Sequence, residues 1–164
     1  MADINTGPNP LFLREDQLHQ AMELLFYAYR DFTAECDAML ATYGFGRAHH
    51  RVIYFVGRYP NLSVSELLSI LRITKQSLSR VLGELVAQGF VSARPGPTDR
   101  RRRMLELTEK GRALESRLST IQRACIARAY REAGGEAVAG FRKVLLGILT
   151  GDDRKRFERG GAAT

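Results

Sequence analysis

The amino-acid sequence predicts a mainly α-helical protein with a small β-hairpin. Apolar residues recur at helical spacing through most of its 164 residues. Near the middle, two short helices with capping residues follow each other closely. Two short strand-like segments, separated by a loop rich in proline and glycine, come directly after them. We therefore expect one helical domain that carries the hairpin as an appendage.

A first long helix is expected from about Arg14 to Ala41. Its apolar residues alternate at steps of four and three, which keeps one stripe facing a partner helix. They are Leu18, Met22, Leu25, Tyr29, Phe32, Cys36 and Met39. This is more apolar surface than one small domain usually covers, so we expect a second chain against it, with Leu18, Met22 and Leu25 in the contact. Residues 1–13 before the helix are expected to be a flexible terminus.

Three shorter helices are expected next. One covers about residues 47–59, and Ser63 with Glu66 forms a capping box that opens another. Thr74 caps a third, which ends at Gly89. The last two are joined so tightly that they match the helix-turn-helix pattern. The expected inner residues of the helix after Thr74 are Leu78, Val81, Leu82, Leu85 and Val86.

The hairpin and two more helices complete the predicted elements. Residues 90–94 and 102–107 are expected to be strands, with an exposed Pro/Gly loop between them. One helix starts near Thr108 and a second covers about 136–149. Their apolar residues expected at a subunit interface are Leu118, Ile121, Phe141, Leu145 and Ile148. Residues 151–164 are expected to be a C-terminal tail.

Positive charge is concentrated in one part of the chain. The formal net charge is +7, and residues 71–103 contain eight Lys or Arg against only two acids, Glu84 and Asp99. A basic block confined to one helix and one hairpin indicates a polyphosphate partner. Double-stranded DNA is the first candidate.

The helix after Thr74 begins with exposed-looking polar residues that could read DNA. Lys, Arg, Gln and Ser can bond to base edges in the major groove, and no carboxylate lies among them. A merely solvated helix face is the alternative, which the basic hairpin makes less attractive. The expected DNA-facing residues, with the two capping residues included, are Ser63, Thr74, Lys75, Gln76, Ser77, Ser79 and Arg80.

At the hairpin, Asp99 precedes four arginines. Side chains alternate between the two sides of a strand, so only one or two of these arginines can reach forward from the tip. An arginine is favoured in a narrow minor groove by the negative potential there. We expect Asp99 to orient a neighbouring arginine through a forked ion pair. Asp99, Arg100, Arg101 and Arg102 complete the expected DNA-binding set.

Two segments, LSVSELLSILRITKQSLSRVLGELVAQGFV (62–91) and DRRRRMLELTEKGRAL (99–114), resemble the MarR family of bacterial winged-helix regulators. The likeness covers about residues 44–114, and the flanking helices fit. It implies a homodimer, with dimerisation helices at 14–41 and 109–150 around a winged helix-turn-helix at 42–108. It also implies that Gln76, Ser77 and Arg80 read bases or nearby phosphates, and that Arg101 enters the minor groove. Such a protein would regulate transcription, most simply as a repressor.

The resemblance further implies control by a small effector. Tyr27, Arg30, His50 and Tyr54 would line a pocket for an aromatic or anionic ligand between the dimer helices and the winged helix. Thiol oxidation is the alternative trigger, because some relatives sense peroxides through a cysteine of the first helix. Cys36 comes late in its helix for that role, and core packing is the simpler interpretation of both Cys36 and Cys125.

Several other classes of protein fit poorly. No P-loop, HExxH or GxSxG motif is present, so we expect no enzyme and no cofactor. His49 and His50 point about 100° apart on a helix, which disfavours a shared metal. An RNA-binding winged helix remains as a rival, although Phe90 is the only aromatic residue of the basic block available for base stacking. The absence of a signal sequence or membrane span predicts a cytoplasmic location.

Overall fold

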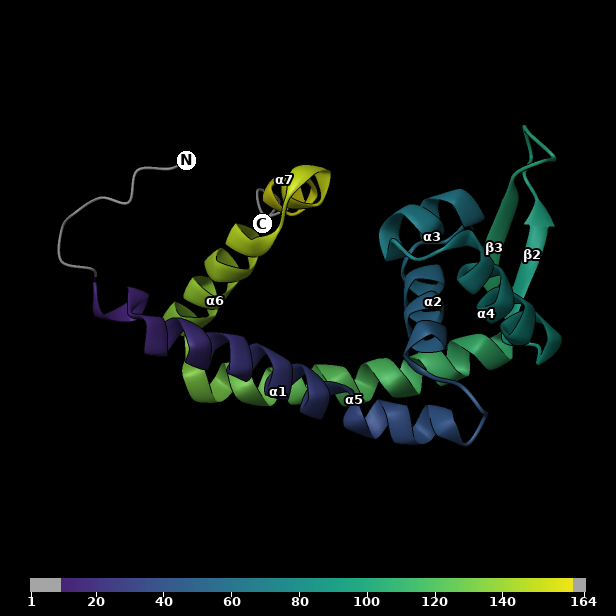
Figure 1. Ribbon diagram of the computed structural model, residues 1–164. Coiled ribbons are helices and arrows are strands. Elements are labelled where there is room, and N and C mark those ends of the chain that lie inside the picture. Colours follow the sequence, from purple (N-terminus) through teal and green to yellow (C-terminus); the bar gives the residue numbers. More distant parts are fainter. Residues whose placement is uncertain (1–9, 161–164) are drawn as a thin grey trace. The chain divides into compact units, whose positions relative to one another are not determined.

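The computed structural model describes residues 10–160, which are mostly helical (Figure 1). They form two compact units, divided between residues 122 and 123. The prediction of a mainly helical fold with a small hairpin is confirmed. In chain order the elements are a 3₁₀ turn η1 (Leu11–Leu13), α1 (Glu15–Ala41), α2 (Arg47–Arg58), β1 (Leu62–Ser63), α3 (Val64–Leu71), α4 (Lys75–Ala87), β2 (Val91–Pro95), β3 (Arg103–Leu107), α5 (Glu109–Ala133), α6 (Gly135–Ile148) and α7 (Gly151–Gly160).

Three elements were not expected from the sequence. The 3₁₀ turn η1 lies within the segment expected to be flexible, and β1 has only two residues, too few for a strand pattern. Helix α7 lies in the expected tail. Acidic residues in its first turn complement the helix dipole, and Arg154 pairs with Glu158 one turn later. Residues 1–9 and 161–164 of the two expected tails lie outside the described residues.

A three-stranded antiparallel sheet holds the hairpin, in the order β1-β3-β2. Figure 1 shows β2 and β3 side by side. Val91 faces Leu107 and Pro95 faces Arg103, so residues 96–102 form the loop at the hairpin tip. Pairing of Leu62 with Leu105 makes β3 the central strand. The hairpin is therefore attached at its base to the start of α3.

Side-chain caps define where α3 and α4 begin, as predicted. The Ser63 hydroxyl accepts from the Glu66 backbone N–H at 3.2 Å, and the Glu66 carboxylate accepts from the Ser63 N–H at 2.8 Å. At α4, the Thr74 hydroxyl accepts from the Ser77 N–H at 3.1 Å. Each cap satisfies backbone donors that have no partner inside the helix.

The core of the first unit lies between the end of α1, helices α2, α3 and α4, the sheet and the first half of α5. Leu78, Val81, Leu82 and Leu85 of α4 are buried in it, as predicted. Val86 is 41% exposed, so its prediction as an inner residue was wrong. It follows Leu85 by one residue and points about 100° away from it. Phe90 is buried beside the rings of Tyr43 and Phe45.

A Leu-Thr-x-x-Gly motif at residues 107–111 joins the hairpin to α5. The Thr108 hydroxyl donates to the Gly89 carbonyl at 2.6 Å and accepts from the Gly111 N–H at 3.0 Å. A Cβ at residue 111 would lie 2.0 Å from the Phe90 carbonyl oxygen, so only glycine fits. The motif therefore fixes the start of α5 against the base of the hairpin.

None of the helices formed by residues 10–160 is long and apolar enough to cross a membrane.

Candidate nucleic-acid interface

Helix α4 turns its polar N-terminal side to solvent. Its buried residues, among them Leu78 and Leu85, occupy the opposite side and anchor the helix in the core. The exposed side chains are all donors or acceptors suited to base edges and phosphates. They are Lys75, Gln76, Ser77, Ser79 and Arg80, the residues predicted from the sequence, and Thr74 beside them is also exposed.

Three of these exposed residues already have partners within the chain. The Thr74 hydroxyl donates to the Ser77 Oγ at 2.8 Å, so these side chains hold each other at the helix start. Arg80 Nη1 donates to Glu84 Oε1 at 2.9 Å. Glu84 in turn contacts His49 of α2, a link that the sequence analysis missed. An acidic residue four positions after Arg80 was the available signal for the first of these contacts.

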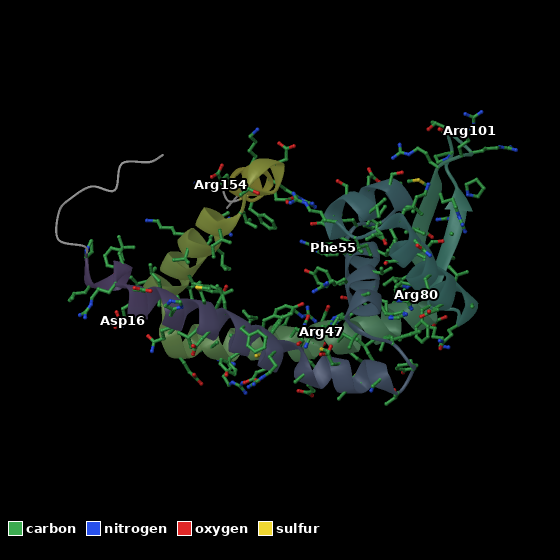
Figure 2. All side chains as sticks on the ribbon, viewed as in Figure 1. Asp16, Arg47, Phe55, Arg80, Arg101 and Arg154 are labelled. Carbon is green, nitrogen blue, oxygen red and sulfur yellow. The ribbon has the colours of Figure 1, made fainter. Side chains whose placement is uncertain are left out.

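The hairpin tip presents arginines to solvent (Figure 2). The turn is closed by the Gly96 N–H, which donates to the Arg102 carbonyl at 2.7 Å. Asp99 Oδ1 accepts from the backbone N–H of Arg101 at 2.9 Å. The expected forked ion pair between Asp99 and a neighbouring guanidinium is therefore wrong. Asp99 shapes the loop, because a short carboxylate caps the backbone of a turn two residues later.

The Arg102 side chain points back to the start of α3 and not forward from the hairpin tip. Its Nη2 donates to the Ser63 Oγ at 3.2 Å and lies 3.8 Å from Glu66 Oε1. Ser63 is only 1% exposed, so its prediction as a DNA contact was wrong. Arg102 is likewise tied to the start of α3. The pairing of Ser63 with Met104 brings these residues together, which no local sequence pattern revealed.

The four residues predicted to line an effector pocket do not form the main polar cluster. Arg30 lies 4.7 Å above the Tyr27 ring and bonds to Asp31, all on α1. On α2, His50 is buried and Tyr54 is partly exposed. Burial lowers the pKa of His50, and the carboxylates of Asp37 and Glu115 only partly oppose this. The sequence therefore did not identify the residues that meet between these helices.

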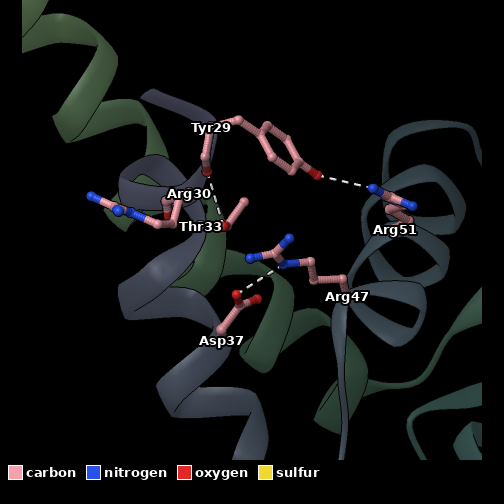
Figure 3. A network of polar contacts seen from close by, with 6 residues as sticks. All are labelled: Tyr29, Arg30, Thr33, Asp37, Arg47 and Arg51. Carbon is pink, nitrogen blue, oxygen red and sulfur yellow. Dashed lines mark hydrogen bonds and ion pairs between the residues drawn. The ribbon is translucent and has the colours of Figure 1, made fainter. Parts of the chain in front are cut away.

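A different set connects α1 to α2 (Figure 3). Arg51 Nη2 donates to the Tyr29 hydroxyl at 3.0 Å, and Arg47 Nε donates to Asp37 Oδ2 at 3.0 Å. The Arg47 guanidinium also lies 5.6 Å from the centre of the Tyr29 ring. Arg47 and Arg51 are four residues apart on one face of α2, which was the available sequence signal. The structure thus places two guanidinium groups beside one phenol.

Most residues predicted at a subunit interface are exposed in the single chain. Leu18, Met22 and Leu25 of α1 are 47%, 65% and 53% exposed. Phe141, Leu145 and Ile148 of α6 are exposed as well, and Ile121 is partly buried against the core. Leu118 is 1% exposed, so its assignment to an interface was wrong. It lies in the core, where its backbone carbonyl meets Cys36.

The two cysteines lie in different environments. Cys36 is fully buried, and its thiol donates to the Leu118 carbonyl at 3.6 Å. Burial, followed by the nearby Glu35 and Asp37 carboxylates, raises the pKa of the Cys36 thiol. A raised pKa disfavours the reactive thiolate. Cys125 is partly exposed.

Across residues 10–160, no group of three or more His, Cys, Asp or Glu side chains could hold a metal ion.

Comparison with known proteins agrees with this architecture. The model of the MarR family matches residues 43–102. The HTH-type transcriptional regulator PetP of Rhodobacter capsulatus is 48% identical over 160 residues, which is 96% of each chain. The regulator PrsX of Escherichia coli is 26% identical over 144 residues, covering 87% of this chain and 77% of PrsX.

Solved structures share the fold. FabT of Streptococcus pneumoniae, in complex with DNA, has a TM-score of 0.70 at 20% identity, covering 80% of this chain and 94% of FabT. A mutant MarR from E. coli, complexed with operator DNA, has a TM-score of 0.65 at 20% identity, covering 87% of this chain and 100% of that one. The curated relatives are regulators and not enzymes. With an extensive match to PetP, the chain belongs to the MarR family of transcriptional regulators.

Proposed function

We propose that the chain is a homodimeric repressor that binds a pseudo-palindromic site in double-stranded DNA, in the cytoplasm. One observation carries the proposal. The exposed donors of α4 and the arginines of the hairpin tip belong to one winged helix, whose core is closed without them. The DNA present in the FabT and mutant MarR structures supports the same partner here.

The two parts of this surface would have different tasks. The start of α4, with Gln76 and Arg80, would read base edges in the major groove. Arg101 would enter the minor groove from the hairpin tip, where its guanidinium is exposed. Arg102 would hold the hairpin in place through Ser63 instead of contacting DNA. Specificity would therefore come mainly from α4, and affinity largely from the tip.

A homodimer would supply two such surfaces. The exposed apolar residues of α1, and separately those of α6, are surfaces that a second copy would cover. Two recognition helices about 34 Å apart would then meet successive turns of the major groove. An RNA partner is the rival, but Phe90 is 1% exposed and cannot stack on a base. Competition between duplex DNA, structured RNA and single strands decides between them, and a preference for RNA would refute the proposal.

Effector control is a second proposal, favoured by the Tyr29, Arg47 and Arg51 cluster. Two guanidinium groups beside a phenol suit a small aromatic acid. Benzoate should release bound DNA from the wild type but not from Arg51→Ala.

The alternative is oxidation, tested with peroxide on wild type and on a Cys36→Ser, Cys125→Ser variant. If peroxide releases DNA from the wild type but not from this variant, the redox alternative is established.

The deciding experiment starts from the duplex that the wild-type chain enriches from a randomised pool. Arg101→Ala should weaken binding to this duplex and to a scrambled duplex alike, by about 1–3 kcal/mol. Gln76→Ala should weaken binding to the selected duplex only, because base contacts carry specificity. Arg117→Ala, on the exposed side of α5, is the matched control for loss of charge. If Arg101→Ala and Gln76→Ala both bind like wild type, these contacts are wrong.

A further inference from the structure

Glu84 is the only acidic residue of α4. A carboxylate on a helix that faces DNA repels phosphate, so its presence calls for a physical reason. Glu84 Oε1 accepts from Arg80 Nη1 at 2.9 Å, and Glu84 Oε2 lies 2.5 Å from His49 Nε2. The carboxylate thus bridges an exposed arginine and a histidine that is 5% exposed.

His49 is held rigidly by its surroundings. Its ring stacks on the buried ring of Phe45, with 4.7 Å between centroids and 16° between planes. Its Nδ1 accepts from the Gly46 backbone N–H at 3.0 Å, at the start of α2. Because Nδ1 accepts this hydrogen bond, Nε2 is the ring nitrogen that can donate to Glu84.

The contact with His49 fixes the position of the Glu84 carboxylate, whose other oxygen bonds to Arg80. Hydrogen bonding from His49, and then from Arg80, lowers the pKa of Glu84, so the carboxylate is ionised at neutral pH. A guanidinium has five N–H donors, and Arg80 uses Nη1 to bond to Glu84, which leaves others for DNA.

An exposed ion pair alone would hold Arg80 only weakly. Pairs of this kind contribute about 0–1 kcal/mol, since both side chains move freely in solvent. Here one partner is anchored: Glu84 is held by a buried ring on a different helix. The remaining freedom is therefore that of Arg80, whose side chain is 65% exposed.

We propose that His49 and Glu84 form a brace that positions the Arg80 guanidinium on the DNA-reading face, and so determine sequence specificity. This rests on the proposed DNA-binding function. Glu84 directs Arg80 toward one bonding geometry and reduces its attraction to phosphates in general. The brace thus raises the ratio between affinities for the selected and the scrambled duplex. His49 and Glu84 are positioning residues, which contribute through Arg80.

The test measures dissociation constants for the selected and the scrambled duplex at one salt concentration. His49→Phe keeps a ring against Phe45 but removes the donor to Glu84 and leaves the net charge unchanged. It should weaken binding to the selected duplex roughly three- to thirtyfold, which lies within the range for side chains coupled in one hydrogen-bond network. The scrambled duplex should bind as before. Glu84→Gln should lower the same ratio, mainly by tightening binding to the scrambled duplex.

Repeating both substitutions in an Arg80→Ala background separates positioning from simple charge. If the brace acts through Arg80, neither substitution changes the ratio there by more than about twofold. Glu35→Gln on α1 is the control for an equal change of charge outside α4. Thermal unfolding checks that each variant folds. If His49→Phe does not fold, Glu84→Gln decides, because its side chain is partly exposed.

The outcomes distinguish failure of the brace from failure of the proposed function. If the wild type does not discriminate between the duplexes, specific DNA binding fails, and the brace with it. If the wild type discriminates but His49→Phe and Glu84→Gln keep its ratio, only the brace is overturned. The same holds if Arg80→Ala has no effect on the ratio, or if the ratio changes equally with and without Arg80.

Discussion

Helices α4 and α6 both carry an apolar stripe, but only the stripe of α4 is buried. On α4, four apolar residues are buried within the first unit. On α6 no residue is buried, and Phe141, Val144 and Ile148 are 46%, 62% and 57% exposed. Helix α1 combines both situations, because Leu18 and Met22 are exposed while Cys36 and Leu40 are buried. The winged helix closes its own core, whereas the apolar stripes of α6 and of the start of α1 stay exposed in the single chain.

The largest effect is expected from Leu85→Ala in the closed core. Leu85 is fully buried, so its truncation should lower the free energy of unfolding by about 2–5 kcal/mol. Urea unfolding at two protein concentrations measures this, and the loss should be the same at both. Leu145→Ala on α6 is the matched control. Its effect on the free energy of unfolding should grow with protein concentration, because Leu145 is expected to contact a second copy. A loss below about 1 kcal/mol for Leu85→Ala would contradict this view of the core.

Next in size is the loss of dimerisation in Phe141→Asp. A charge placed in the exposed stripe of α6 should weaken self-association by at least about 2 kcal/mol, as expected for an aromatic anchor of an interface. Sedimentation equilibrium measures the association constant. Lys143→Asp on the same helix is the control and should leave the dimer intact. Equal dimerisation of Phe141→Asp and wild type would place the interface elsewhere.

A smaller effect is expected from Ser63→Ala. Loss of the cap of α3 should cost about 1 kcal/mol of stability. The same substitution removes the acceptor for Arg102, so backbone amides of the hairpin should exchange faster with deuterium. Ser65→Ala, an exposed neighbour, is the control. Unchanged exchange in the hairpin would show that Arg102 does not anchor it.

The smallest effect concerns pH. Because burial lowers the pKa of His50 below its usual 6.5, the unfolded chain binds the proton more readily than the folded one. The stability contribution of neutral His50 is therefore fully present above pH 6.5, and it declines as pH falls toward the folded-state pKa. Lowering pH from 7.5 to 5.5 should cost up to about 1 kcal/mol through this residue. Urea unfolding of His50→Gln should show a smaller difference between these pH values.

Features that depend on a few neighbouring residues could be predicted well from the sequence. The capping box at Ser63 and the cap at Thr74 each join residues three positions apart. The polar side of α4 follows from helical periodicity once its apolar residues are identified. Helix α7 was missed because Phe157 is the only large apolar residue within it, so no helical periodicity of apolar residues marks it.

Contacts between distant segments could not be predicted in the same way. The sequence indicated a DNA-facing Arg102, yet its partner Ser63 lies 39 positions earlier and becomes adjacent only through the β1–β3 pairing. The interface role expected for Leu118 failed because helical periodicity does not say which neighbour covers an apolar face. The contact that joins Tyr29 of α1 to Arg51 of α2 was not expected for a similar reason, and the effector residues expected from the sequence stay a prediction.

The sequence by itself therefore determined the helices of the winged helix, their caps, the hairpin and the concentration of positive charge on it. These follow from hydrogen bonds and periodicities that span only a few residues. Only the tertiary structure decided which arginines stay free and which are held. His49 meets Glu84 across 35 positions, and Cys36 meets Leu118 across 82. Such contacts form because packing of the core brings distant segments together, and no local pattern encodes that distance.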